Sequence, residues 1–501
     1  MLKILFLLTL IPLFSFSQVK YEKKISIEIE KNWISRYVKE FGENGLLFRY
    51  EDRKRTNRER KWHYRLYNKN LKLQNEKSVT IPSNFYVETV VNDSIRNYTL
   101  FKKSNKFSLV TFNSKNCNLT KISGVFPKKF LQDNLIKVKG DIVYIKGKIK
   151  RTPTLLTINW KTGEQKSIPL LFDGIKSKKL IDFQLAKNTK EILLYFSDKS
   201  YKDKRTYKDS YIRKIDDKGN YSDLINLTQQ SENRLINVKS TSFKNNSTLF
   251  LGEWANKSYD RRGFSTNELR ENSGVYFCKI DGNKVDFLKF IKTSLILSEL
   301  AKNENWWKKS QGINHFCNYK LIIKPDGYIV VLEISEKYYF KYTTEFIYKG
   351  AFIVKFALNG DFLWHHALEI QPLNKPHYSS RNPSEFGKIS LKSRSDFFNY
   401  TKLRFISVDE LNNNYLKLTY ESEKKIINKI FDESGNIIVD TETEEIITFD
   451  EDVKLYRDNS KIVHWFDKCF IAIIRKNIKN SEFKSSNKKK QVYSISKILY
   501  N

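Results

Sequence analysis

Six cationic side chains lie close together near the start of the chain and could hold an anion. Within nine residues the sequence places Arg53, Lys54, Arg55, Arg58, Arg60 and Lys61. Such a cluster could bind phosphate or sulfate groups, and a formal net charge of +34 would steer a polyanion toward it. The alternative is that these cations only keep a surface solvated. We take the six residues as candidate binding residues in a loop between two strands.

Two groups of aromatic residues could stack on sugar rings. Tyr338 and Tyr342 recur at period two around Phe340, which places them on one face of an expected strand. Trp306 and Trp307 precede two lysines and could bind an acidic glycan. Packing in the hydrophobic core is the other use of such side chains. We therefore add Trp306, Trp307, Tyr338 and Tyr342 to the candidate binding residues as a second hypothesis.

No residue pattern points to a catalytic or metal centre. The chain lacks nucleophile-elbow, zinc-protease, dinucleotide-binding and phosphate-loop motifs, and its Cys and His residues have no zinc-ligand spacing. His315 and Cys317 could pair as base and nucleophile, but one such spacing is weak support. Carboxylates could also pair across a mouth, as in glycosidases, the candidates being Asp396, Asp409, Glu410 and Asp432. We predict no catalytic residue, no metal and no cofactor.

The first 17 residues have the pattern of a secretory signal peptide. Lys3 precedes a stretch of about 14 apolar residues, which is too short to span a bilayer, since that takes roughly 20. Ser15 and Ser17 provide small residues before a cut at Gln18. We therefore expect an exported protein in the periplasm, at the cell surface or outside the cell. We expect no transmembrane segment in the mature chain.

Polar turns recur along the chain between strand-like segments. They begin at positions 67, 113, 159, 216, 281, 359 and 432, and the first two intervals are 46 residues each. Asn, Asp and Gly suit hairpin turns, and a period of about 40–50 residues is typical of β-propeller blades. The sequence predicts an all-β fold, a β-propeller of seven or eight four-stranded blades over residues 44–501, after an N-terminal segment at 18–43. Residues 33–41 and 294–310 are predicted as one or two short inserted helices.

Two segments carry a family resemblance. The run from Trp62 to Lys72 and the run from Gly350 to Trp364 resemble exported, propeller-like proteins of unknown function from the Bacteroidota. This resemblance implies a propeller fold and an exported location. It assigns no catalytic residue.

These observations favour a non-catalytic binding or scaffold protein of the cell envelope. Its expected partner is an anionic glycan, lipopolysaccharide or an envelope protein, whereas nucleic acid is not expected outside the cytoplasm. The alternative function is a secreted glycan hydrolase with carboxylates in the propeller mouth. The step from fold to function is an analogy, because propellers serve many functions.

Overall fold

The computed structural model gives the positions of most of the chain. The described residues are 19–29, 33–56, 58–150, 152–170, 178–185, 192–199, 207–216, 220–227, 233–244, 247–256, 273–282, 284–296, 298, 313–339, 343–370, 377–381, 406–412, 415–422, 425–442, 461–466, 469–478 and 490–500. The fold is all-β, as predicted. In this part of the chain, no helix is long and apolar enough to cross a membrane.

The described strands form eight antiparallel sheets, which we number along the chain. Sheet 1 contains β2 (Trp33–Glu40), β3 (Leu46–Thr56), β4 (Glu59–Tyr67) and β5 (Leu73–Pro82). Sheet 2 contains β6 (Tyr86–Asn92), β7 (Arg96–Lys103), β8 (Lys106–Asn113) and β9 (Leu119–Val125). Sheet 3 contains β10 (Phe130–Lys139), β11 (Ile142–Ile149), β12 (Thr152–Asn159) and β13 (Gln165–Pro169). Sheet 4 contains β14 (Lys178–Leu185), β15 (Ile192–Lys199), β16 (Tyr207–Ile215) and β17 (Ile225–Asn226).

The remaining four sheets follow the same order. Sheet 5 contains β18 (Asn233–Lys244), β19 (Ser247–Asn256), β20 (Ser273–Asp281) and β21 (Lys284–Lys292). Sheet 6 contains β22 (Ile313–Lys324), β23 (Gly327–Tyr339), β24 (Thr343–Ala357) and β25 (Phe362–Glu369), and β26 (His377–Arg381) also pairs with β24. Sheet 7 contains β27 (Ile406–Asn412), β28 (Tyr415–Ser422), β29 (Lys425–Phe431) and β30 (Ile437–Glu442). Sheet 8 contains β31 (Lys461–Phe466), β32 (Cys469–Ile478), β33 (Lys490–Tyr500) and β1 (Val19–Ile29).

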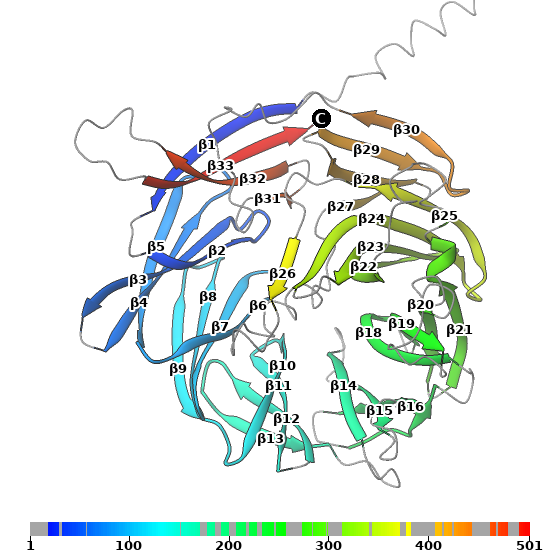
Figure 1. The fold of residues 1–501 in the computed structure, drawn as a ribbon, viewed down its shortest axis with the longest axis horizontal. Helices are drawn as coiled ribbons and strands as arrows, with labels where there is room; N and C mark the ends of the chain where they lie inside the picture. Colours follow the sequence, from blue (N-terminus) through cyan, green and yellow to red (C-terminus); the bar gives the residue numbers. More distant parts are fainter. Residues whose placement is uncertain are drawn as a thin grey trace, which may run out of the picture.

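The sheets are arranged around a common centre, and the first strand of each lies innermost (Figure 1). Each innermost strand shows a register shift against the second strand, as between Val87 and Thr89 in β6 or between Phe316 and Asn318 in β22. A register shift of this kind bends a strand and increases its twist. These shifts therefore bend the innermost strand of every sheet.

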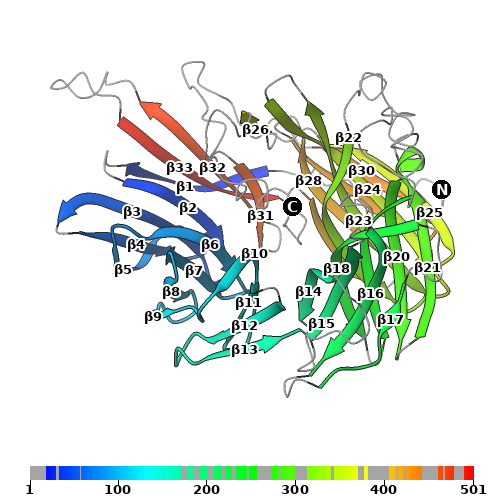
Figure 2. The same ribbon diagram turned by 60° about the horizontal axis from the view of Figure 1, so that its bottom comes forward.

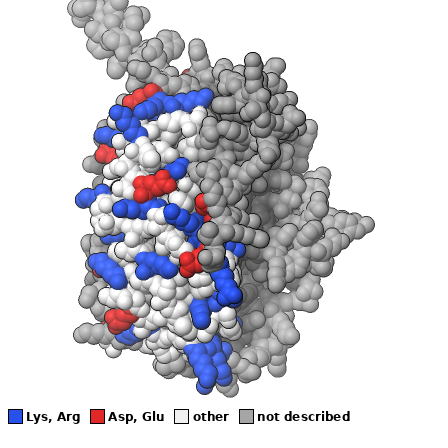
Figure 3. All heavy atoms as spheres, turned by 90° about the vertical axis from the view of Figure 1, so that its left-hand side faces the viewer, with Lys and Arg blue, Asp and Glu red and all other residues white. Residues whose placement is uncertain are grey.

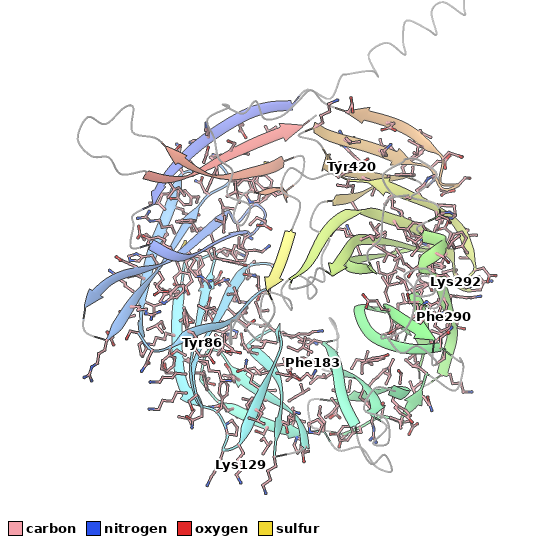
Figure 4. The ribbon with its side chains drawn as sticks, viewed as in Figure 1. Tyr86, Lys129, Phe183, Phe290, Lys292 and Tyr420 are labelled. Atoms are coloured by element: carbon pink, nitrogen blue, oxygen red, sulfur yellow. The ribbon has the colours of Figure 1, made fainter. Side chains whose placement is uncertain are left out.

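Neighbouring sheets share hydrophobic cores. Seven clusters of buried residues each combine side chains from two successive sheets, running from the junction of sheets 8 and 1 to that of sheets 6 and 7. Phe183 of β14, labelled in Figure 4, is fully buried between sheets 3 and 4. Tyr420 of β28 is 2% exposed between sheets 6 and 7. Each sheet thus packs against at least one neighbouring sheet, and sheets 1 to 6 pack against two.

The N-terminal strand completes the last sheet. β1 pairs with β33 from Val19 opposite Tyr500 to Ile29 opposite Gln491, and both views of the ribbon show the two strands side by side (Figures 1 and 2). Ile27 is buried with Phe48 of sheet 1 and Ile471 of sheet 8. Residues 18–43, which the sequence set apart from the repeats, therefore supply β1 and β2 to two different sheets.

The seven predicted turns all join the third and fourth strands of a sheet. Sheet 8 has no such turn, because its fourth strand comes from the other end of the chain.

The helix predicted at 33–41 is wrong, since residues 33–40 form β2. Its pairing with the apolar start of β3 outweighs three aromatic residues at helical spacing. Of the second predicted helix, residues 294–296 and 298 are helical and the rest lies outside the described residues.

Loss of apolar contact at the closing strand should destabilise the whole fold. We expect Ile27→Ala to lower the free energy of unfolding by about 2–4 kcal/mol, because it leaves a cavity in the core between sheets 8 and 1. Lys24→Ala, at an exposed position of the same strand, should change it by less than about 0.5 kcal/mol. Urea denaturation of both variants measures the difference. Equal effects would show that β1 does not contribute its apolar face to the core.

Candidate functional site

The strand order gives the molecule two ends with different connections. At one end, here called the turn end, short turns join first to second and third to fourth strands. At the other, the loop end, lie the connections from second to third strand and from one sheet to the next. Backbone hydrogen bonds link the connections at each end: Ser83 N donates to Arg58 O at 2.6 Å at the loop end, and Ser114 N donates to Ile95 O at 2.8 Å at the turn end.

Seven of the ten candidate residues from the sequence are described, and all seven belong to loop-end segments. The six cations lie in β3, β4 and the hairpin turn between them, and Tyr338 lies in β23 close to the next such hairpin. The side chains of Arg53, Lys54, Arg55 and Tyr338 are not described. Trp306 and Trp307, between β21 and β22, and Tyr342, between β23 and β24, lie outside the described residues.

The cationic run does not present all its charges on one surface. Arg60 Nη1 lies 3.0 Å from Oε1 of Glu51, whose side chain is 3% exposed, so this cation balances a buried carboxylate. Lys61 is exposed and lies on the opposite face of the hairpin, because successive strand residues alternate. Arg58 is exposed at the turn, where its backbone φ is 61°. The cations are close in the sequence, but the strand register places Arg60 and Lys61 on opposite faces of the hairpin.

The catalytic pairings considered from sequence find no support in the backbone. A register shift at Cys317 breaks the alternation that would have placed it on the same face as His315. Asp409 and Glu410 are adjacent in β27, and adjacent strand residues belong to opposite faces. Asp432 accepts hydrogen bonds from Asn436 within its own turn. Asp396 lies outside the described residues.

Several described carboxylates are held by cations or amide groups. Burial raises the pKa of Glu76, but hydrogen bonds from Arg65 Nε at 2.9 Å and from His63 Nδ1 at 2.9 Å more than offset it, so the pKa lies below its ordinary value. The hydrogen bond from Lys355 lowers the pKa of Asp326. The one from Lys289 does the same for Asp361. A general acid in a glycosidase needs a raised pKa, so these three carboxyls are not suited to that role.

A polar groove lies at the turn end between sheets 1 and 2. Its volume is about 310 Å³, and the sequence did not single it out. Its walls come from the turn between β2 and β3, the turn between β4 and β5, the start of β5, and the turn between β8 and β9. The lining residues are Glu43, Asn44, Asn68, Lys69, Asn70, Gln74, Ser114 and Lys115.

The turns that form the groove are fixed by their own side chains. Asn68 Oδ1 accepts hydrogen bonds from the backbone N–H groups of Asn70 and Lys72, each at 3.0 Å. Asn113 Oδ1 accepts one from Lys115 N at 2.9 Å. Ser114 is 2% exposed and donates through its hydroxyl to Ile95 O at 2.8 Å. Such side chain–backbone bonds hold turns in one conformation, so the groove is formed before any ligand arrives.

The groove combines amide groups with positive charge. Asn44, Asn70 and Gln74 each carry both hydrogen-bond donors and an acceptor, and Asn68, whose oxygen is used within its turn, carries donors. Lys69 and Lys115 are exposed, as is the one carboxylate of the lining, Glu43. Figure 3 shows the flank of the molecule that carries sheet 1, on which Lys and Arg are spread more widely than Asp and Glu. The groove can thus offer many hydrogen bonds to a polar ligand, and its two lysines can both contact an anionic group.

No protein-family model matches the chain, and no curated protein matches it. Among solved structures, the chain is similar to the polysaccharide lyase Uly1, with a TM-score of 0.37, 6% identity, and coverage of 82% of this chain and 89% of that chain. It is also similar to the Dos1 propeller, with a TM-score of 0.36, 9% identity, and coverage of 75% and 74%. For TolB from Acinetobacter baumannii the TM-score is 0.28, with 11% identity and 78% of each chain covered. Because each TM-score is below 0.5, none of these likenesses bears on the activity of this chain.

The bonds to Glu76 should make stability depend on acid pH. The folded pKa lies below 4.5, so the stabilisation is complete above pH 4.5 and is lost as the pH falls from there toward the folded pKa. We therefore expect the urea midpoint of the wild type to fall more between pH 6 and pH 3 than that of Glu76→Gln. Glu164→Gln, at an exposed turn position, should behave as the wild type does. Identical pH profiles for Glu76→Gln and the wild type would contradict the role of this carboxylate.

Proposed function

We propose that the protein is an exported, non-catalytic binding protein of the cell envelope that holds an anionic glycan at its turn end. The observation that carries this proposal is the composition of the groove between sheets 1 and 2. Four amide side chains and two lysines surround an open space of about 310 Å³. A ligand that matches this lining has many hydroxyl groups and a negative charge, which are the features of an acidic sugar.

The chemistry of the lining favours a sugar over an apolar ligand. Amide groups can donate to and accept from hydroxyl groups at the same time, and Glu43 can accept further hydrogen bonds. Lys69 and Lys115 can pair with a carboxylate or sulfate, which gives preference for an acidic sugar over a neutral one. The lining contains no aromatic residue, so recognition here rests on hydrogen bonds and charge rather than on ring stacking.

A rigid scaffold supports a binding role. We take the eight sheets to be the blades of an eight-bladed β-propeller that β1 closes. Three observations support this: sheets 1 to 7 run outward in chain order, described cores join sheet 8 to sheet 1 and each of sheets 1 to 6 to the next, and the N-terminal strand completes the last sheet. Propeller blades leave only short edges and present their turns as a fixed platform. The groove uses two such neighbouring blades.

Export is part of the proposal. The predicted cut before Gln18 would leave β1, which begins at Val19, at the start of the mature chain. Removal of residues 1–17 would leave every described strand in place. An exported protein meets the anionic glycans and lipopolysaccharide of an envelope, and this suits the ligand class that the groove favours.

Glycan binding can be measured directly with oligogalacturonate as the probe. We expect Asn70→Ala with Gln74→Ala to weaken binding about tenfold, because each hydrogen bond lost contributes about 0.5–1.5 kcal/mol. Asn105→Ala, an exposed amide at the loop end of sheet 2, is the matched control and should bind as the wild type does. Isothermal titration calorimetry at physiological salt gives the affinities.

A second pair of variants tests the cationic run against the groove. Arg58→Ser with Lys61→Ser should leave the affinity unchanged if the ligand lies at the turn end. A loss in this variant, with none in the Asn70 and Gln74 variant, would place the ligand at the loop end and contradict the site. Cleavage of the probe during the titration would favour the hydrolase over the binding protein.

A further inference from the structure

A lysine recurs in each of three successive turns. Lys69, Lys115 and Lys161 are spaced by 46 residues, and each lies in the turn between the third and fourth strands, in sheets 1, 2 and 3. All three are exposed. Equal spacing in the sequence therefore corresponds to one lysine per sheet along the turn end.

The backbone holds two of these lysines in the same local geometry, whereas in the first turn Asn70 takes the equivalent place and Lys69 comes one residue earlier. Lys115 N donates to Asn113 Oδ1 at 2.9 Å, and Lys161 N donates to Asn159 Oδ1 at 2.9 Å. The residue before each lysine is bonded to the neighbouring turn of its own sheet, with Ser114 N donating to Ile95 O and Trp160 N donating to Asp141 O. The lysines are thus carried by fixed turns, which limits the entropy lost when a ligand binds.

The same turn position carries the opposite charge elsewhere. In sheet 6, Asp361 N donates to Asn359 Oδ1 at 3.0 Å, which is the pattern of Lys115 and Lys161, but the side chain is a carboxylate. The lysine row therefore does not extend to this part of the turn end. An anionic chain would find a cation at sheets 1 to 3 and an acid at sheet 6.

We propose that the turn end binds a linear polyanion that runs across sheets 1, 2 and 3 and contacts one lysine in each. This inference rests on the proposed function and names its ligand class: an acidic polysaccharide with a negative charge on successive sugars, rather than a single acidic sugar. The groove between Lys69 and Lys115 holds one stretch of the chain. Lys161 then holds the next stretch, one sheet further along.

Existing contacts of Lys161 do not oppose this role. Its Nζ lies 2.8 Å from Asp141 Oδ2, but the two side chains are 54% and 43% exposed, and exposed pairs of this kind contribute little. The ammonium group also lies 5.4 Å from the centroid of the Trp160 ring, which is 8% exposed. A carboxylate of the ligand can therefore replace Asp141 at little cost.

The test compares short and long oligogalacturonates on the intact mature chain. We expect affinity to rise with length until the oligomer spans three sheets. Lys69→Ser and Lys115→Ser should each weaken binding of every length about twofold to fivefold. Lys161→Ser should weaken only the long oligomers. Each substitution should also make the slope of log affinity against log salt concentration less steep by about one unit.

Lys103→Ser and Lys106→Ser are matched controls. They remove the same charge from exposed positions at the loop end of sheet 2 and should leave the affinity for both lengths unchanged. Equal loss in all five variants would mean that net charge alone drives binding, which would overturn the lysine row.

The outcomes separate this inference from the proposed function. If short and long oligomers bind equally tightly and Lys161→Ser has no effect, the ligand is a single acidic sugar unit; the groove then remains the site, and the linear arrangement is wrong. If oligomers of no length bind, the proposed function fails, and the inference fails with it.

Discussion

The pairing of β1 with β33 is the constraint on which the rest of the structure depends. It joins Val19 to Tyr500 and thereby links the two ends of the described chain within one sheet. Without β1, sheet 8 would lose its outermost strand and expose a free edge, and Ile27 would leave the core that it shares with sheet 1. Because the other described cores each couple one sheet to the next, this junction connects the start of the series to its end.

In a molecule built in this way, the connections at the turn end are short and alike, whereas those at the loop end differ in length. Short turns with Asn or Asp side chains hold the turn end, and their bonds to backbone N–H groups recur from Asn68 to Asp432. Strands that end at the loop end flank the longer intervals in the sequence, such as 257–272 and 382–405, and these intervals account for the longer repeats in the second half of the chain. Fixed turns suit the binding surface that we propose, and the three lysines and the groove lie at this end. At the same end, sheet 6 carries an acid.

Features that depend on residues close in the sequence could be predicted better than features that depend on strand pairing or on packing between sheets. Asn113 and Asn159 marked turns because their side chains act within a few residues, and the all-β fold followed from those turns. The strand at Trp33–Glu40 was missed, because its partner strand decides its conformation. Arg60 and Lys61 were grouped although strand register separates them. The groove was also missed, because Asn70 and Ser114 come to line one space only when two sheets pack. The recurrence of lysine at 69, 115 and 161 was the available signal.

The central claim is that an acidic glycan binds at the turn end across sheets 1 and 2. Hydrogen–deuterium exchange of the mature protein, with and without a long oligogalacturonate, tests this claim most directly, because it locates the ligand without a substitution. The account predicts slower exchange in the turns at 68–72 and 114–118, with 160–164 protected as well, and no change in the hairpin at 53–61. Protection confined to 53–61, or to other loop-end segments, would contradict it.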